Sequence, residues 1–245
     1  MKKSIILIYG GLAYVIFLFA FLYSIGFVGN FFVPKSIDSS SEIGISTSIF
    51  INLLLLSVFA LQHSIMARPR FKKWFTTIIS PASERSTYVL LSSLALLLVF
   101  WQWKPISSIV WNVENEIISM ILVGVFFLGW IIVLLSTFMI NHFELFGLAQ
   151  IYDNLKDRVT PNPKFQTNYL YTIVRHPIML GFLIAFWATP RMTIGHLLFT
   201  IITTLYIFIA VKYLEEKDLR KLIGNDYEMY QKKVPMIIPF MKRKQ

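Results

Sequence analysis

The sequence predicts an all-α polytopic membrane protein, a helix bundle of about five to six transmembrane segments, of which the last two form a helical hairpin followed by a cytoplasmic helical tail. Two observations carry this prediction. The chain of 245 residues is 56% hydrophobic and only 15% charged, which is far more apolar than an ordinary soluble domain. Its apolar residues also gather in runs long enough to cross a hydrocarbon core of about 30 Å.

Six apolar segments are expected to form the spans. The first has the basic start of a signal peptide, but its apolar body is too long for one and no small-residue cleavage site follows, so we interpret it as a retained span. The fifth segment is short for a full crossing, and a turn at Pro190 joins it to the sixth. The segments are residues 5–33, 45–66, 86–103, 117–140, 177–189 and 193–211.

The basic residues test this layout, because Lys and Arg collect on the cytoplasmic side of a membrane. With the N-terminus inside, the predicted inner segments hold 20 of them, and the outer loops hold only Lys35, Lys104 and Arg191. This asymmetry predicts an integral protein of the bacterial inner membrane with both termini in the cytoplasm. We therefore interpret the net charge of +10 as orienting the chain in the lipid bilayer, and not as a sign of nucleic-acid binding.

Several classes of site are absent from the sequence. The chain has no cysteine, which excludes disulfides, thiolate metal sites and a cysteine nucleophile. It has no Gly-rich phosphate loop and no cluster with recognised metal-ligand spacing, so no metal is expected. No βαβ pattern is present, which excludes a soluble dinucleotide-binding site.

Two polar groups lie at the cytoplasmic ends of the predicted hairpin. Arg175-His176-Pro177 begins its first helix; a plain helix start, with Pro at the first position and a snorkelling Arg, is the alternative. Glu215 and Glu216 end its second helix, where negative charge opposes the helix dipole; a solvated face is the alternative. A rise of about 1.5 Å per residue predicts that Glu215 lies roughly 12 Å deeper toward the cytoplasm than His176. That separation suits a ligand with both an amine and a carboxylate.

Two further groups flank these. Tyr227 and Tyr230 are one helical turn apart in the tail and are also typical of a membrane interface. Asn141, His142 and Glu144 close the fourth span in "NHFELFG", where a helix cap is the alternative interpretation. We also predict that the tail helix stops near Gly224.

Two candidates lie at the second and third spans. His63 is inside the second span, where an ionisable residue is a functional hypothesis by default, although a packed, hydrogen-bonded histidine remains the alternative. Arg85 precedes the third span in "ERS", where it also fits an interfacial salt bridge beside a helix cap. His196 falls on the outer side and is interpreted as structural.

The C-terminal motifs "VRHPIMLGFLIAFWATP" and "LEEKDLRKLIGNDYEMYQKKVPMIIP" resemble those of the integral-membrane methyltransferases, a superfamily that includes isoprenylcysteine carboxyl methyltransferases and phospholipid methyltransferases. With "FALQHSIMARPRFKKWF" and "INHFELFGLAQ", the chain is similar to the methanethiol S-methyltransferases over nearly its whole length. Those enzymes are similar in turn to membrane proteins associated with denitrification. Met179 departs from the superfamily, which often has Tyr there.

The resemblance implies an enzyme that transfers a methyl group from S-adenosylmethionine to methanethiol, giving dimethyl sulfide and S-adenosylhomocysteine. It implies one methyltransferase domain over residues 1–245, with a four-span scaffold (1–140) and a loop, hairpin and tail that bind the cofactor (141–245). It places the cofactor near His176, Glu215 and Glu216, closed over by Tyr227 and Tyr230. The full set of expected cofactor-binding residues is Arg175, His176, Gly181, Glu215, Glu216, Tyr227, Tyr230, Asn141 and Glu144.

A thiol must lose its proton before methyl transfer, and three residues are candidates for this step: His63 or His142 as the base, with Arg85 as electrostatic help. The residues do not choose among them. Two alternatives stay open for the function. One is methylation of a lipid amine, a prenylcysteine or another thiol. The other is a non-catalytic membrane protein related to denitrification-associated factors.

Overall fold

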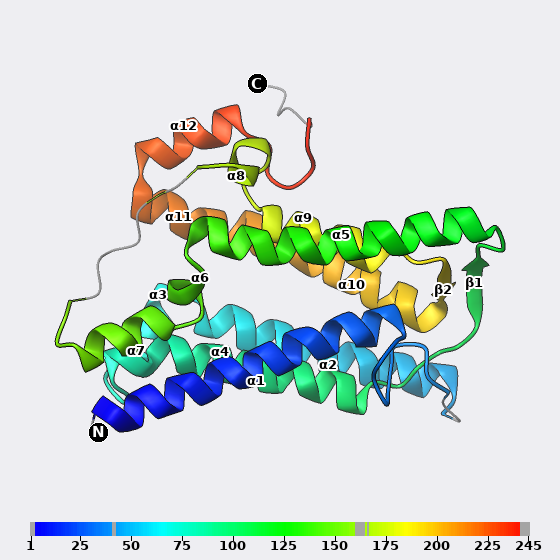
Figure 1. The fold of residues 1–245 in the computed structure, drawn as a ribbon, viewed down its shortest axis with the longest axis horizontal. Coiled ribbons are helices and arrows are strands. Elements are labelled where there is room, and N and C mark those ends of the chain that lie inside the picture. The colour runs from blue at the N-terminus through cyan, green and yellow to red at the C-terminus, as the bar shows by residue number, and fades with distance from the viewer. Residues whose placement is uncertain (1–2, 41–42, 160–164, 166, 241–245) are drawn as a thin grey trace. The chain divides into compact units, whose positions relative to one another are not determined.

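The computed structural model describes residues 3–40, 43–159, 165 and 167–240, and most of them are helical (Figure 1). Five helices are long and apolar enough to cross a membrane. They are α1 (Lys3–Gly29), α2 (Ile45–Met66), α4 (Pro81–Gln102), α5 (Glu116–Ile140) and one continuous helix, Ile194–Ile223, made of α10 (Ile194–Ile209), the π-helical segment η1 (Ala210–Glu215) and α11 (Glu216–Ile223). The predicted all-α polytopic membrane fold is confirmed.

The shorter elements occupy the connections and the tail. They are α3 (Pro69–Phe75), α6 (His142–Leu145), α7 (Leu148–Leu155), α8 (Leu170–Ile173), α9 (Pro177–Trp187), α12 (Asn225–Lys233) and the strands β1 (Ile109–Asn112) and β2 (Arg191–Thr193). The polar stretch between α5 and α9 contains three of these short helices, and its residues 160–164 and 166 lie outside the described part of the chain. With 11 residues, α9 extends about 16 Å, too short to cross a membrane by itself.

The third span begins earlier than the sequence indicated. Ser80 precedes α4 and Pro81 is its first residue, because Pro has the backbone angle of a helix start and needs no hydrogen-bond partner there. Glu84, Arg85 and Ser86 therefore lie inside the helix, and the interpretation of "ERS" as residues flanking a cap is wrong. The predicted stop at Gly224 is confirmed: this glycine adopts a positive φ of 74° between α11 and α12.

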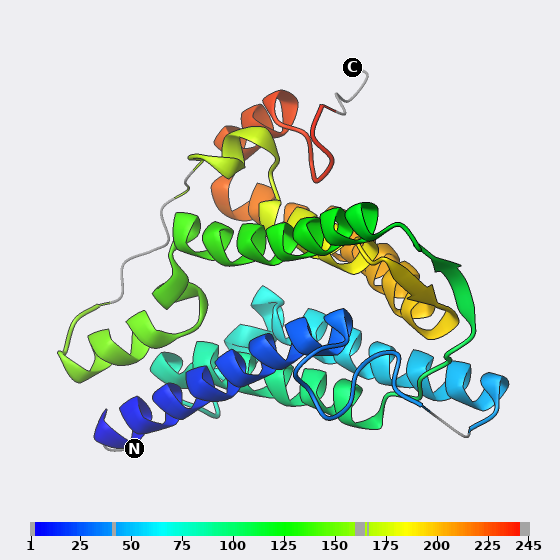
Figure 2. The ribbon, with the colours of Figure 1, turned by 45° about the vertical axis from the view of Figure 1, so that its right-hand side comes forward.

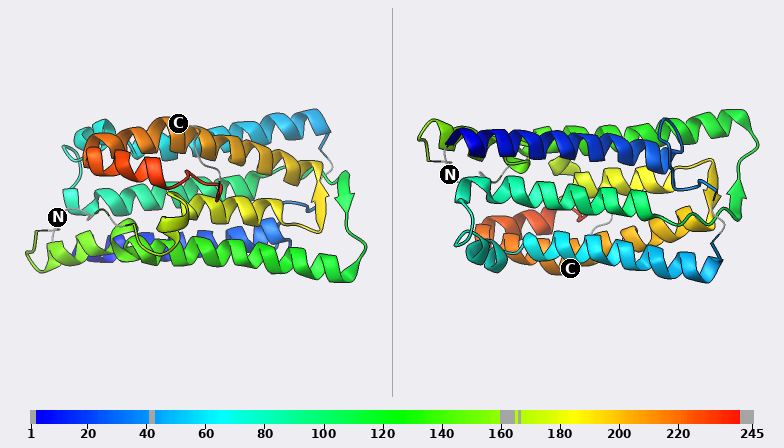
Figure 3. Two further views of the ribbon diagram at one scale, coloured as in Figure 1. Left: turned by 90° about the horizontal axis from the view of Figure 1, so that it is seen from above. Right: turned by 90° about the horizontal axis from the view of Figure 1, so that it is seen from below.

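The segment after Pro190 is more than a turn. Residues 191–193 form β2, which pairs with β1 in a two-stranded sheet (Figure 3). Ile, Val and Trp in β1 favour extended backbone, but four residues are too few for a recognisable alternation. Consequently the sixth span starts at Ile194, and not at Thr193 as predicted.

The chain divides into two compact units. The first contains Met1–Val110, His142–Asn162 and Thr193–Phe199. Within it, α1 and α2 both pack along α4, as Figure 1 shows. Small residues permit the packing: a Cβ at Gly10 of α1 would lie 2.6 Å from Ile151 of α7 and 2.9 Å from Ser86 of α4. Gly147, with φ of +87°, comes equally close to the backbone of Ser86.

The second unit contains Trp111–Asn141, Pro163–Met192 and Thr200–Gln245. Its closest helix pair is α5 and α9, which run side by side (Figure 2). The two helices touch backbone to backbone at Gly129 and Gly181, because a Cβ at Gly181 would lie 2.6 Å from the carbonyl oxygen of Gly129. Such small-residue contacts are the usual way in which helices associate in a membrane, where lipid is as apolar as the side chains.

The close contact of α5 and α9 predicts a clear effect of Gly129→Ala. The new Cβ would lie 2.6 Å from the backbone nitrogen of Ala185, so we expect the free energy of unfolding to fall by about 1–3 kcal/mol through overpacking. Thermal unfolding in detergent measures this. Gly124→Ala on the same helix is the matched control, since nothing lies within 4 Å of its Cβ. Equal loss in both variants would contradict the packing argument.

Candidate functional site

The Arg175-His176-Pro177 motif joins the start of α9 to the C-terminal tail. Pro177 occupies the first position of α9, as expected for a helix start. The backbone nitrogens of the two preceding residues donate hydrogen bonds to the tail: Arg175 to the carbonyl oxygen of Pro235 at 2.9 Å, and His176 to that of Met236 at 3.0 Å. The motif is therefore more than a helix start, because it holds the tail by its backbone.

The side chain of Arg175 lies in the centre of a buried polar cluster. Its Nη2 is 2.5 Å from Oε1 of Glu216, and the two side chains are only 4% and 2% exposed. Its Nε donates to the same oxygen at 2.7 Å, and its Nη1 donates to the carbonyl oxygens of Gln231 and Val234. Removing one partner of such a buried pair typically costs about 3–5 kcal/mol, since the other charge is left uncompensated.

The adjacent acids Glu215 and Glu216 have different surroundings. Glu216 uses both carboxylate oxygens within the protein: Oε1 is bound by Arg175 and lies 3.3 Å from Nε2 of His176, and Oε2 accepts from Gln231 Nε2 at 2.9 Å. Glu215 has a side chain that is 44% exposed, with Oε1 at 3.5 Å from Nδ1 of His176. The carboxylate of Glu216 is thus buried within the protein, whereas the side chain of Glu215 is partly exposed to the surroundings.

These contacts overturn the predicted offset of roughly 12 Å between His176 and Glu215, which are in contact. That estimate counted every residue of the hairpin as helical. The arm that contains α9 has 11 helical residues, but residues 188–193 are not helical and rise about 3.3 Å each where they are extended. The other arm, from Ile194 to Glu215, is helical throughout. It has more residues, but the extended residues 188–193 lengthen the first arm, so the two arms end at a similar level.

The π-helical segment η1 ends at the two acids. At its end, the backbone nitrogen of Glu216 donates a hydrogen bond to the carbonyl oxygen of Val211, five residues earlier. Such segments insert one extra residue into a helix and are frequent at functional sites. From Ile194, about 20 residues cross a hydrocarbon core, so Glu215 and Glu216 follow directly after the apolar part of their helix.

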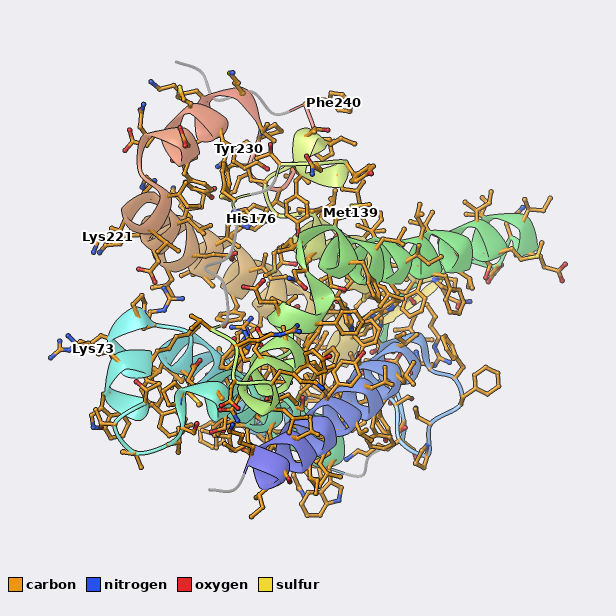
Figure 4. The ribbon with its side chains drawn as sticks, turned by 60° about the vertical axis from the view of Figure 1, so that its left-hand side comes forward. Lys73, Met139, His176, Lys221, Tyr230 and Phe240 are labelled. Carbon is orange, nitrogen blue, oxygen red and sulfur yellow. The ribbon has the colours of Figure 1, made fainter. Side chains whose placement is uncertain are left out.

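The tail tyrosines lie beside this cluster and differ in their hydroxyl groups. Tyr230, labelled with His176 in Figure 4, donates its hydroxyl to the carbonyl oxygen of Tyr171 at 2.5 Å. Tyr227 is 2% exposed, and among the described residues its hydroxyl has no hydrogen-bond partner. Burial and the charge of Glu216 raise the pKa of Tyr227, while Arg175 lowers it. Its phenol is therefore within electrostatic reach of the cluster and stays protonated.

The remaining predicted cofactor-binding residues lie elsewhere. Gly181 lies where α9 touches Gly129 of α5, so its lack of a side chain is needed for the packing of these two helices. Asn141 ends α5, where its backbone nitrogen donates to Thr137. Glu144 is in α6 of the first unit, where its carbonyl oxygen accepts from Gln150.

The three candidates for thiol deprotonation all belong to the first unit. His63 of α2 contacts the hydroxyl of Tyr88 at 3.0 Å. Arg85 has its Cζ 5.1 Å from the centre of the same Tyr88 ring and donates from Nε to the carbonyl oxygen of Leu145 at 2.6 Å. His142 begins α6 and has its Nε2 2.8 Å from the hydroxyl of Tyr14. Burial lowers the pKa of His142.

Sequence reasoning missed three residues of these clusters: Gln231, Tyr171 and Tyr88. Helical spacing could have found two of them. Gln231 follows Tyr227 by four residues, so it shares that helix face. Tyr88 follows Arg85 by three residues and shares its helix face, but the predicted span began at residue 86 and so left Arg85 outside the helix. Tyr171 takes part through its backbone oxygen, for which a sequence carries no signal.

The fold and the buried Arg175 cluster define a polytopic helical membrane protein with an ionic site at the end of a spanning helix. The family model described as NnrU protein matches residues 51–218. Methanethiol S-methyltransferase 1 of Bradyrhizobium diazoefficiens is 50% identical over 98% of this chain and 84% of its own length. Methanethiol S-methyltransferase of Crocosphaera subtropica is 49% identical over 100% of this chain and 95% of its own.

The chain therefore belongs to the NnrU family and is related over nearly its whole length to these methanethiol S-methyltransferases, so the resemblance seen in its motifs is confirmed. Nurim of Homo sapiens is a more distant relative, 30% identical over 70% of this chain and 68% of its own length. No solved structure matches the chain.

The charge on His176 predicts a pH dependence of stability. Burial lowers the pKa of His176, but Glu215 and Glu216 outweigh burial and raise it to about 9, above the ordinary value of about 6.5. The folded protein therefore keeps a proton that the unfolded chain releases. This stabilisation is complete below about pH 6.5 and is lost as the pH rises through about 9.

Thermal unfolding in detergent should show a midpoint that falls across that pH window. The free energy of unfolding should fall by up to about 3 kcal/mol, at 1.36 kcal/mol per pKa unit. His176→Gln should flatten the dependence in the same window. The tyrosines of the site ionise above about pH 10 and do not interfere. An equally steep fall in His176→Gln would contradict the assignment.

Proposed function

We propose that the protein is an enzyme that methylates methanethiol to dimethyl sulfide with S-adenosylmethionine as the methyl donor. The observation that carries this proposal is the identity of about half of the residues, over nearly the whole chain, to relatives named methanethiol S-methyltransferase. The buried ionic cluster of the second unit supports it, because such a cluster is expensive in a membrane protein and typically serves function.

The residues of this cluster fit the amino acid end of the cofactor. The buried hydroxyl of Tyr227 has no partner among the described residues, so a ligand atom would satisfy it. The exposed carboxylate of Glu215 suits a ligand ammonium. The protonated imidazole of His176, whose pKa burial lowers but the two glutamates raise to about 9, suits a ligand carboxylate. S-adenosylmethionine, when bound, supplies a methyl group activated by its positively charged sulfur.

The two acids have separate roles in this proposal. Glu216 holds Arg175, and through it the tail, with oxygens that are already occupied. Glu215 contacts the ligand. Gly181, Asn141 and Glu144 stay further candidates for cofactor binding, with Tyr230 holding the tail in place through Tyr171.

The chain's own part in the chemistry is to remove the proton of the thiol. A simple alkanethiol has a pKa above the roughly 8.5 of cysteine, so a base is needed at neutral pH. His63 or His142 takes this proton, and the positive charge of Arg85 favours the thiolate. Reaction of an anionic thiolate with a cationic donor cancels charge, which a site poor in water favours.

The enzyme works in this proposal as one integral-membrane domain, with residues 1–140 as the scaffold and 141–245 as the cofactor-binding part. The excess of Lys and Arg on the predicted inner segments orients both termini and the cofactor site toward the cytoplasm. A bacterial inner membrane is the membrane expected for this arrangement.

Purified protein with methyl-labelled S-adenosylmethionine should convert methanethiol to labelled dimethyl sulfide, detected in the headspace. Longer thiols, a prenylcysteine and lipid amines are offered in parallel, because each stands for an alternative acceptor. Transfer to a lipid amine or a prenylcysteine in place of methanethiol would overturn the proposed substrate. Absence of both transfer and cofactor binding would favour a non-catalytic membrane protein.

Glu215→Gln should weaken S-adenosylmethionine binding about 10- to 100-fold, since a charged hydrogen bond is worth about 1.5–3 kcal/mol, and should lower the thermal midpoint less than Glu216→Gln does. Glu216→Gln should lower both the cofactor affinity and the thermal midpoint, because it leaves the buried charge of Arg175 without its ion-pair partner. Calorimetry and thermal unfolding measure the two effects. Glu228→Gln, an exposed acid on α12, is the control. Unchanged affinity in Glu215→Gln would remove this residue from the site.

A further inference from the structure

A second polar cluster lies between α2 and α4, inside the first unit. The hydroxyl of Tyr88 is 3.0 Å from Nε2 and 3.1 Å from Nδ1 of His63, and the hydroxyl of Ser92 is 3.3 Å from Nδ1. Gln62 donates from Nε2 to Ser92 at 3.3 Å. Four polar side chains are thus gathered within two apolar spans, where each is costly unless it has partners or a function.

Two features of this cluster point to a small ligand. Oε1 of Gln62 is buried and has no hydrogen-bond partner in the described part of the chain, so it can accept a hydrogen bond from a bound molecule. The ring of Phe59 stacks on that of His63 with centroids 5.4 Å apart, and Gln62 also contacts the sulfur of Met66. A small molecule with one weak donor and an apolar body, such as an alkanethiol, matches these surroundings.

The two candidate histidines differ in access. His142 is 5% exposed, with the ring of Phe146 at 4.8 Å and the hydroxyl of Tyr14 at 2.8 Å from Nε2. His63 is half-buried. A base must come within hydrogen-bond reach of the proton that it removes. This favours His63 as the base and gives His142 a packing role.

Tyr88 connects His63 with the positive charge of Arg85. Its hydroxyl is within hydrogen-bond distance of both ring nitrogens, so it can accept a hydrogen bond from the nitrogen that carries the proton and leave the other nitrogen to act as the base. The guanidinium of Arg85 lies over its ring, a favourable cation–π arrangement. Arg85 is fixed in turn by the carbonyl oxygen of Leu145. The fixed positive charge of Arg85 over the ring of Tyr88 favours an anionic thiolate near this cluster.

We propose that His63 is the base that deprotonates the thiol, and that Tyr88 and Ser92 are positioning residues that hold its imidazole. This inference rests on the proposed function. The S–H bond of the thiol breaks and its proton passes to an unprotonated nitrogen of His63. The thiolate sulfur forms a bond to the methyl carbon as the bond between that carbon and the donor sulfur breaks. The imidazolium then releases its proton to water.

Two thiols of the same skeleton and different acidity test the proposal: ethanethiol and the more acidic 2,2,2-trifluoroethanethiol. Loss of a base slows a weakly acidic thiol more than one that ionises by itself. His63→Ala should lower kcat for ethanethiol at least about 100-fold and for the fluorinated thiol less than about 10-fold. Tyr88→Phe and Ser92→Ala should show the same imbalance to a smaller degree, with KM little changed.

Matched controls come from α1 and α4. Tyr9→Phe removes a hydroxyl bonded to Thr87, and Ser93→Ala removes one bonded within α4 to Val89; neither should distinguish the two thiols. Equal loss for both thiols in His63→Ala and Tyr88→Phe would mean a structural role and overturn the proposal, as would full activity in His63→Ala.

Methanethiol gives an independent readout through pH. The activity of His63→Ala should recover as the pH is raised toward the pKa of the thiol, because the medium then supplies the ionised form. The titratable and charged groups that face His63 from α4 are the hydroxyl of Tyr88 and, over the ring of Tyr88, the guanidinium of Arg85. Activity that stays low at every pH would count against His63 as the base. Cofactor affinity is measured in each variant, and wild-type protein that neither binds cofactor nor transfers methyl groups would refute the proposed function instead.

Discussion

The buried ion pair of Arg175 and Glu216 is the constraint on which the second unit depends. Two charges withdrawn from water are tolerated only when they are paired and their remaining hydrogen-bonding groups are satisfied. Here Arg175 lies just before α9 and Glu216 begins α11, while Gln231 of α12 and Val234 directly after it supply the remaining partners. The polar tail must therefore fold against the apolar helices for the pair to be stable.

Apolar contacts hold the tail on the other side of this pair. Ile237, 1% exposed, packs with Ile207 and Val211, directly after the two backbone hydrogen bonds that Arg175 and His176 make to the tail. The tail thus alternates between polar and apolar attachments along its length. This explains how a segment rich in charged residues remains part of a membrane protein.

The parts of the fold predicted from sequence are those set by local chemistry. The spans follow from hydropathy, the stop at Gly224 from the backbone freedom of glycine, and the Arg-His-Pro and Glu-Glu elements from polar residues at apolar boundaries. The predicted distance between His176 and Glu215 was wrong because it depended on residues 188–193, which are not helical. Helical spacing places Gln231 and Tyr88 beside predicted site residues, but their contacts with other helices depend on which helix faces meet, and spacing alone does not give that.

The charges of the site explain why an amino acid end suits it in the proposed function. Arg175 and protonated His176 balance Glu215 and Glu216, so the cluster is neutral as a whole. A ligand with one ammonium and one carboxylate is also neutral. Its ammonium can replace His176 beside Glu215, and its carboxylate can replace Glu215 beside His176, while Arg175 and Glu216 stay paired. The amino acid end of the ligand therefore adds no net charge to the buried cluster, which avoids the penalty that an unpaired ammonium or carboxylate would meet there.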